Sequence, residues 1–181
     1  MPAMQPRLRC ALTLFLLLAA ACAFAGDDDD DKPAPHFRAK TMSGESFNNE
    51  SVKGKVVLLE FWTTWCKYCH QEEPLVEAIN QEFSDKGLIV LAIDVAESKK
   101  TVKKYLEQHP RACRIVLTED TNLAAMYQAN EYPIYVVIDR DGNIAGEQHG
   151  AAGEKALRRL LASADIEARE KSDGDKSAED K

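Results

Sequence analysis

Cys66 and Cys69, two cysteines separated by two residues, are the side chains of this sequence best suited to covalent chemistry. This spacing predicts thiol–disulfide exchange, in which one thiolate attacks a disulfide and a second thiol resolves the mixed disulfide. Cys66 is expected to be the nucleophile because it begins a helix, whose unpaired N–H groups stabilise a thiolate. Cys69 follows one turn later, close enough to form a disulfide with Cys66, and is expected to resolve the mixed disulfide.

The elements that must position this pair are a strand before it and a helix after it. An apolar, β-branched-rich run begins at Val56 and predicts a buried strand, and apolar residues at helical spacing continue to Phe83. Glu60 interrupts the strand, where an unpaired acid is costly. Burial is expected to raise its pKa toward neutrality and make it the proton acceptor for Cys69. A glutamate that bends out to a lysine or to water is the alternative.

The rest of the sequence predicts the order of the remaining strands and helices. Apolar, β-branched segments predict strands, amphipathic segments predict helices, and Gly- or Asp-rich segments predict turns. The predicted strands are 88–95, 114–117, 134–138 and 144–148, and the predicted helices are 99–108, 121–127 and one that contains Leu157, Leu160 and Leu161. This order predicts an α/β fold with mixed strand directions.

The segment Trp65-Cys66-Lys67-Tyr68-Cys69 after its strand resembles the active site of the thioredoxin superfamily, and within it the exported TlpA/ResA-type thiol–disulfide oxidoreductases. Gly44 matches an N-terminal hairpin, Pro74 the helix after the dithiol, and Tyr132-Pro133 the cis-proline loop. The likeness covers residues 35 to 163. It implies a thioredoxin-like fold, with a central mixed β-sheet flanked by helices and an N-terminal β-hairpin extension.

The resemblance also implies roles at the site. Cys66 and Cys69 would form the redox disulfide, and Glu60 would stand behind the resolving cysteine. Glu72 falls where ResA-like proteins carry a glutamate that tunes the active site, although an ordinary acid in the first turns of a helix is the alternative. The residues expected to contact substrate, with Trp65 also covering the thiol, are Trp65, Lys67, Tyr68, Tyr132 and Pro133. No cofactor and no metal are implied.

Other functions remain open at this point. The run from Cys66 to His70 is also a complete c-type haem attachment motif, but haem-c domains are mainly helical, whereas a strand leads into this one. His70 is then expected to lie exposed on the helix. A thiol-dependent peroxidase would carry Pro-x-x-x-Thr-x-x-Cys, and Leu59 stands at the proline position. Cys113 and the scattered histidines lack the spacing of a zinc site, so Cys113 is expected to be a core thiol.

The N-terminal region predicts export. Two arginines precede an apolar run from Ala11 to Ala25 that ends in small residues, as in a secretory signal peptide. The protein is therefore expected in the periplasm or another extracytoplasmic space, with a lipid anchor at Cys22 as the alternative to cleavage. The expected segments are a signal peptide (1–25), an acidic, Pro-containing linker (26–34), a thioredoxin-like domain (35–165) and a disordered charged tail (166–181).

Charge limits the expected partners. The chain has 23 basic and 30 acidic residues and a formal net charge of −7, without the basic cluster that a nucleic-acid binder needs. The resemblance implies a monomer that acts on protein thiols and disulfides, receives electrons from a membrane donor of the thiol-transfer type, and reduces substrates that include apocytochrome c.

Overall fold

A seven-stranded mixed sheet positions the dithiol. The computed structural model describes residues 32–166. The predicted signal peptide, most of the linker and the tail from residue 167 lie outside this range. The strands are β1 (Arg38–Thr41), β2 (Ser46–Asn48), β3 (Val56–Trp62), β4 (Leu88–Asp94), β5 (Arg114–Thr121), β6 (Ile134–Ile138) and β7 (Ile144–His149). The helices are α2 (Lys67–Phe83), the short η1 (Ser84–Lys86), α3 (Lys99–Gln108), α4 (Leu123–Met126) and α5 (Glu154–Ala162).

The strand order across the sheet is β2-β1-β5-β4-β3-β6-β7. The central strands β3, β4 and β5 run parallel, and the remaining pairs are antiparallel. All seven residues of β3 are buried, which explains why its sequence is a nearly continuous apolar run rather than an alternating one. The predicted thioredoxin-like fold, with a mixed sheet and an N-terminal hairpin, is therefore confirmed.

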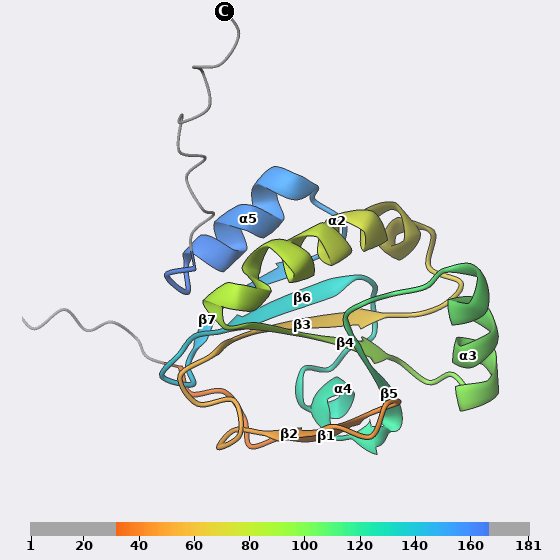
Figure 1. Cartoon of the computed structure of the whole chain (residues 1–181), viewed down its shortest axis with the longest axis horizontal. Helices are drawn as coiled ribbons and strands as arrows, with labels where there is room; N and C mark the ends of the chain where they lie inside the picture. Colours follow the sequence, from red (N-terminus) through yellow and green to blue (C-terminus); the bar gives the residue numbers. More distant parts are fainter. Residues whose placement is uncertain (1–31, 167–181) are drawn as a thin grey trace, which may run out of the picture. The chain divides into compact units, whose positions relative to one another are not determined.

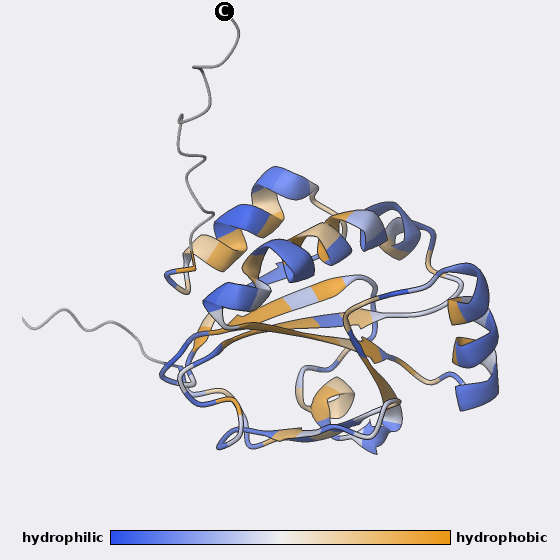
Figure 2. Ribbon diagram, viewed as in Figure 1, coloured by the Kyte–Doolittle hydropathy of each residue, from blue (hydrophilic) through white to orange (hydrophobic). Residues whose placement is uncertain are grey.

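Helices cover both faces of this sheet. Figure 1 shows α2 and α5 on one face and α4 on the other. Alternate residues of the central strands therefore enter two separate apolar cores, one that includes α2 and α5 residues and one that includes α4 residues. In Figure 2 the central strands are largely hydrophobic, while α2, α3 and α5 carry many hydrophilic residues. Glu60 and Trp62 lie on the face that α2 covers.

Two segments differ from the sequence prediction. The predicted helix 121–127 is shortened to α4, because β5 continues to Thr121 and pairs there with Ala39 of β1. The end of the expected linker is packed against the protein: Ala34 is buried and its N–H donates to the carbonyl of Gly142 at 2.9 Å. Within residues 32–166, no helix has the length and apolar character needed to cross a membrane.

Candidate active site

The two cysteines occupy the junction between β3 and α2. Cys66 is the N-cap residue of α2, and its Sγ accepts a hydrogen bond from the Cys69 N–H at 3.1 Å. The two residues form a disulfide, with their Cα atoms 5.3 Å apart. In the reduced protein the same N–H and the positive end of the helix would stabilise a thiolate on Cys66. Both cysteines are buried, so a substrate must reach the Cys66 sulfur past the side chains that surround it.

Exposed aromatic side chains surround the disulfide. Trp65 is 68% exposed and Tyr68 is 59% exposed, which is unusual for large apolar groups. The Tyr132 ring meets that of Trp65 edge-on at 5.8 Å between centroids, and the Tyr132–Pro133 peptide bond is cis. Trp65 thus packs against the cis-proline loop, which brings the two predicted substrate-contacting segments together. Lys67, next to Cys66 in the sequence, is exposed.

His70 ties the active-site loop to α3. Its Nε2 lies 2.8 Å from the carbonyl oxygen of Thr64, and because a carbonyl only accepts, Nε2 carries the proton. The imidazole stacks on the Tyr105 ring at 5.3 Å, and Tyr105 stacks in turn on His109 at 4.4 Å. His70 is therefore half-buried, and the expectation that it lies exposed is wrong.

This geometry agrees with the comparisons to known proteins. The model of the AhpC/TSA family matches residues 31–146, which is more than half of the chain. The chain belongs to the AhpC/TSA family.

Among relatives, the thiol–disulfide oxidoreductase ResA of Bacillus cereus is 31% identical over 130 residues, which cover 72% of this chain and 75% of ResA. The thioredoxin-like protein YneN of Bacillus subtilis is 34% identical over 131 residues, 71% of this chain and 76% of YneN. A thioredoxin-family thiol:disulfide interchange protein of Chlorobium tepidum superposes with a TM-score of 0.66 at 26% identity, covering 76% of this chain and 98% of its own. This AhpC/TSA-family member is thus a thiol–disulfide oxidoreductase of the ResA type.

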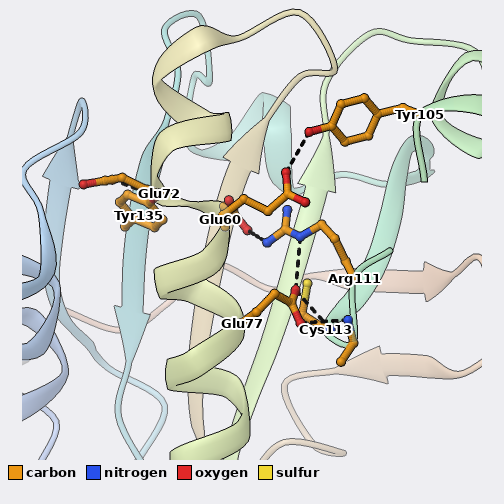
Figure 3. Close-up of polar contacts among 9 residues, drawn as sticks. Glu60, Glu72, Glu77, Tyr105, Arg111, Cys113 and Tyr135 are labelled. Atoms are coloured by element: carbon orange, nitrogen blue, oxygen red, sulfur yellow. Dashed lines mark hydrogen bonds and ion pairs between the residues drawn. The ribbon is translucent and has the colours of Figure 1, made fainter. Parts of the chain in front are cut away.

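Glu60 lies beneath α2 and is completely buried. Its Oε2 accepts a hydrogen bond from Nη2 of Arg111 at 2.6 Å, and its Oε1 has no hydrogen-bond partner within residues 32–166. Burial raises the pKa of Glu60, and the positive charge of Arg111 opposes that rise. Figure 3 shows the carboxylate pointing to the guanidinium. The partner is therefore a buried arginine, and not the lysine or water considered from the sequence.

Arg111 reaches Glu60 from the loop between α3 and β5. Its side chain is 1% exposed, and its Nε donates to Oε1 of Glu77 on α2 at 3.1 Å. Its guanidinium also lies 5.2 Å from the ring centroid of Trp62. Glu77 in turn accepts the N–H of Ala112 at 2.7 Å, which fixes the loop that carries Arg111. Sequence reasoning missed this group, because no local pattern links positions 51 residues apart.

Glu72 connects three elements. Although only 6% exposed, it accepts a hydrogen bond from the Tyr135 hydroxyl of β6 at 3.0 Å and another from the Gly153 N–H before α5 at 2.5 Å. Figure 3 places Glu72 and Tyr135 together, on the other side of Glu60 from Glu77. The structure thus gives Glu72 a bridging role between α2, β6 and α5. Its tuning of the dithiol stays a prediction.

Asp94, at the end of β4, is a second buried acid that sequence reasoning missed. It is fully buried, and neither carboxyl oxygen has a hydrogen-bond partner in the described part of the chain. Burial, and then the negative charge of Glu97, raise its pKa to about 8. Glu97 itself accepts hydrogen bonds from the N–H and hydroxyl of Thr64 at 2.5 and 2.6 Å. An acid inside a predicted strand was the available signal, as it was for Glu60.

Cys113 lies at the other end of the Arg111 loop. It is free and buried, and burial raises the pKa of its thiol. Its N–H donates to Oε1 of Glu77 at 3.4 Å. These surroundings agree with the expected core thiol, because a raised pKa leaves little of the thiolate that reacts.

Proposed function

We propose that this protein is exported and reduces protein disulfides outside the cytoplasm through Cys66 and Cys69, with apocytochrome c among its substrates. The observation that carries this proposal is the position of Cys66 at the N-cap of α2, with its sulfur accepting the Cys69 N–H. That position favours a thiolate, which is the attacking species in disulfide reduction. The likeness to the thiol–disulfide oxidoreductase ResA supports the exchange chemistry, and the apolar N-terminal run of the sequence supports the location.

The reaction would proceed in two exchanges. The Cys66 thiolate attacks one sulfur of the substrate disulfide, a Cys66–substrate bond forms, and the other substrate sulfur leaves as a thiolate that takes up a proton. Cys69 then gives its proton to Glu60, and its thiolate attacks the Cys66 sulfur. The Cys66–Cys69 bond forms, and the second substrate thiol is released. Two electrons pass to the substrate, and a membrane donor of the thiol-transfer type restores the dithiol.

The side chains around the disulfide would select the substrate. The exposed rings of Trp65 and Tyr68 offer apolar surface on either side of Cys66, and Lys67 adds a positive charge. The loop that carries Tyr132 and Pro133 would hold the substrate backbone. Replacing Trp65 with alanine should therefore raise the KM for a protein disulfide more than it lowers kcat. Glu72 would act by holding α2 against β6, so that the dithiol keeps its geometry.

The reduction potential of the Cys66–Cys69 pair is the first measurement. It is obtained from the purified protein equilibrated in dithiothreitol or glutathione buffers, with the fraction of free thiol counted by alkylation. A value near thioredoxin's, about −270 mV, supports a reductase that needs an upstream donor. A value near about −120 mV, that of strong periplasmic oxidants, would reverse the direction and make the protein a disulfide donor.

The substrate is tested with an oxidised peptide that contains the Cys-x-x-Cys-His sequence of an apocytochrome. The reduced protein should convert this peptide to the dithiol faster than it reduces a control peptide. The control has the same length and one disulfide, but its residues are in a scrambled order. A matched control is Cys69→Ser, which should stop after the first exchange and accumulate the mixed disulfide. Equal rates on both peptides would indicate a general disulfide reductase.

A further inference from the structure

The resolving step has an electrostatic requirement that a buried glutamate does not meet by itself. Removing a carboxyl group from water raises its pKa, because the charged form is poorly solvated. A proton acceptor must be ionised before it accepts. Glu60 is completely buried, so it needs a neighbouring positive group if it is to be ionised at neutral pH.

The positive group that lies against the Glu60 carboxyl is the guanidinium of Arg111. Nη2 of Arg111 lies 2.6 Å from Oε2 of Glu60, and the two side chains are 1% and 0% exposed. The contact occupies one carboxyl oxygen only, because Oε1 makes no hydrogen bond within residues 32–166. One carboxyl oxygen of Glu60 thus faces the guanidinium, and the other makes no hydrogen bond to the described residues.

We propose that Arg111 is a positioning residue of the resolving step: it holds Glu60 ionised inside the protein and leaves Oε1 to take the proton of Cys69. This rests on the proposed role of Glu60 as proton acceptor. Arg111 touches neither sulfur nor substrate in this scheme and acts through Glu60. Glu77 would orient the guanidinium from its other side, through the 3.1 Å contact with Nε.

The remaining titratable groups around Glu60 strengthen the need for Arg111. Glu73 and Glu77 on α2 both raise the pKa of Glu60 by like-charge repulsion. The groups that face this cluster from the other packed elements are Tyr105 of α3, Cys113 immediately before β5 and Tyr135 of β6. Each of these three has a raised pKa and is neutral at pH 7, so none supplies a positive charge to Glu60.

The test compares Arg111→Met with three further variants. Arg111→Lys keeps the charge, Glu60→Gln removes the acceptor, and Glu60→Gln with Arg111→Met removes both partners, so that no buried charge is left alone. The matched control is Arg114→Met, because Arg114 forms a partly exposed ion pair with Glu45 at 3.1 Å and does not contact Glu60.

The assay isolates the resolving step. Each reduced protein is mixed with excess oxidised glutathione and quenched with acid at successive times. Alkylation and mass spectrometry then separate the glutathione mixed disulfide from the internal disulfide. The first-order conversion of one into the other is measured from about pH 5 to about pH 9, a range that brackets the protonation of a buried carboxyl group. The carboxylic C=O infrared band that Glu60→Gln removes reports the protonation of Glu60 directly.

Loss of Arg111 should move the pH dependence, not only the rate. Removing an opposite charge at this distance raises a carboxyl pKa by about 1 to 3 units, so Arg111→Met should shift the midpoint of the profile upward by that amount. At pH 7 its resolving rate should fall about tenfold or more. Arg111→Lys should recover most of the wild-type profile and Arg114→Met all of it. The double variant should be no slower than Glu60→Gln, since Arg111 acts through Glu60.

Three results would overturn the inference, and one would remove its basis. An unchanged midpoint in Arg111→Met, an equal slowing at every pH, or additive losses in the double variant would each leave Arg111 a merely structural residue. If Glu60→Gln resolves the mixed disulfide with the wild-type profile, the proposed role of Glu60 itself fails. Should Arg111→Met not fold, Arg111→Lys and the double variant decide the question, because a double variant slower than Glu60→Gln refutes it.

Discussion

Replacing Asp94 with asparagine should stabilise the folded protein, and the gain should grow with pH. Asp94 is fully buried at the end of β4, and its carboxyl oxygens make no hydrogen bond in the described residues. Burial, and then the negative charge of Glu97, raise its pKa from 3.8 to about 8. Asparagine has nearly the same shape and cannot ionise, so it removes this titration and little else.

The direction in which the free energy of unfolding changes with pH follows from proton linkage. Between pH 3.8 and about 8, Asp94 keeps its proton in the folded protein and loses it in the unfolded chain. The folded state binds more protons, so the free energy of unfolding falls as pH rises. The slope is about 1.4 kcal/mol per pH unit, which between pH 5 and pH 7 amounts to about 3 kcal/mol. Above about pH 8 the slope disappears, because Asp94 then ionises in both states.

The measurement is urea unfolding of the oxidised protein at several values from about pH 5 to about pH 8.5, which spans most of the expected titration. Because both proteins keep the Cys66–Cys69 disulfide, the difference in their unfolding free energies isolates Asp94. Asp85→Asn is the matched control, since Asp85 is exposed in η1.

A parallel pH dependence in the wild type and Asp94→Asn would refute the reasoning. That result would mean that Asp94 is ionised in the folded protein, with its charge balanced by a positive group. A constant offset between the two proteins would not rescue the argument, because it reports only how well the amide fits the site.

Three further predictions concern the dithiol and its supports. Cys66→Ser should lose disulfide exchange completely, while Cys69→Ser should accumulate a substrate mixed disulfide visible by mass spectrometry; a fully active Cys69→Ser would exclude resolution by this thiol. Glu72→Ala should lower the free energy of unfolding by about 1 to 3 kcal/mol, because it leaves the buried Tyr135 hydroxyl without a partner and removes the hydrogen bond from the Gly153 N–H; a change within error in urea unfolding would contradict the bridging role. Cys113 should resist iodoacetamide at pH 8 in the folded protein and react once denatured, because burial raises the pKa of its thiol; rapid labelling of the native protein would show that the thiol is accessible.

The parts of this protein that could be predicted are those encoded by local patterns. An apolar run, a turn and helical spacing around Cys66 identify a strand that leads into a helix, and the structure has both. The buried position of Glu60 follows from the same run. The helix expected over 121–127 is shortened to α4 because its first residue pairs with β1, a contact made 82 positions away in the chain. Such pairing overrides a local helical preference.

Arg111 shows why the rest of the site could not be predicted. It stands in a loop, next to Pro110, where an arginine is usually solvated. Its burial depends on three contacts that only the folded sheet and α2 create: Glu60, Glu77 and the ring of Trp62. A buried acid in a sequence therefore predicts that a partner exists, because the charge must be balanced, but it does not say which residue supplies it.

Glu60 and Asp94 present the same physical problem, and the protein meets it in two ways. Both acids interrupt buried parallel strands and point to the face that α2 covers. Glu60 lies against Arg111, which favours the carboxylate, whereas Asp94 lies near Glu97, which favours the neutral acid. Burial raises the pKa of both acids, and only their charged neighbours then act on it in opposite directions. The proton acceptor for Cys69 is therefore expected to be the acid that faces an arginine, because at neutral pH Asp94 already holds its proton.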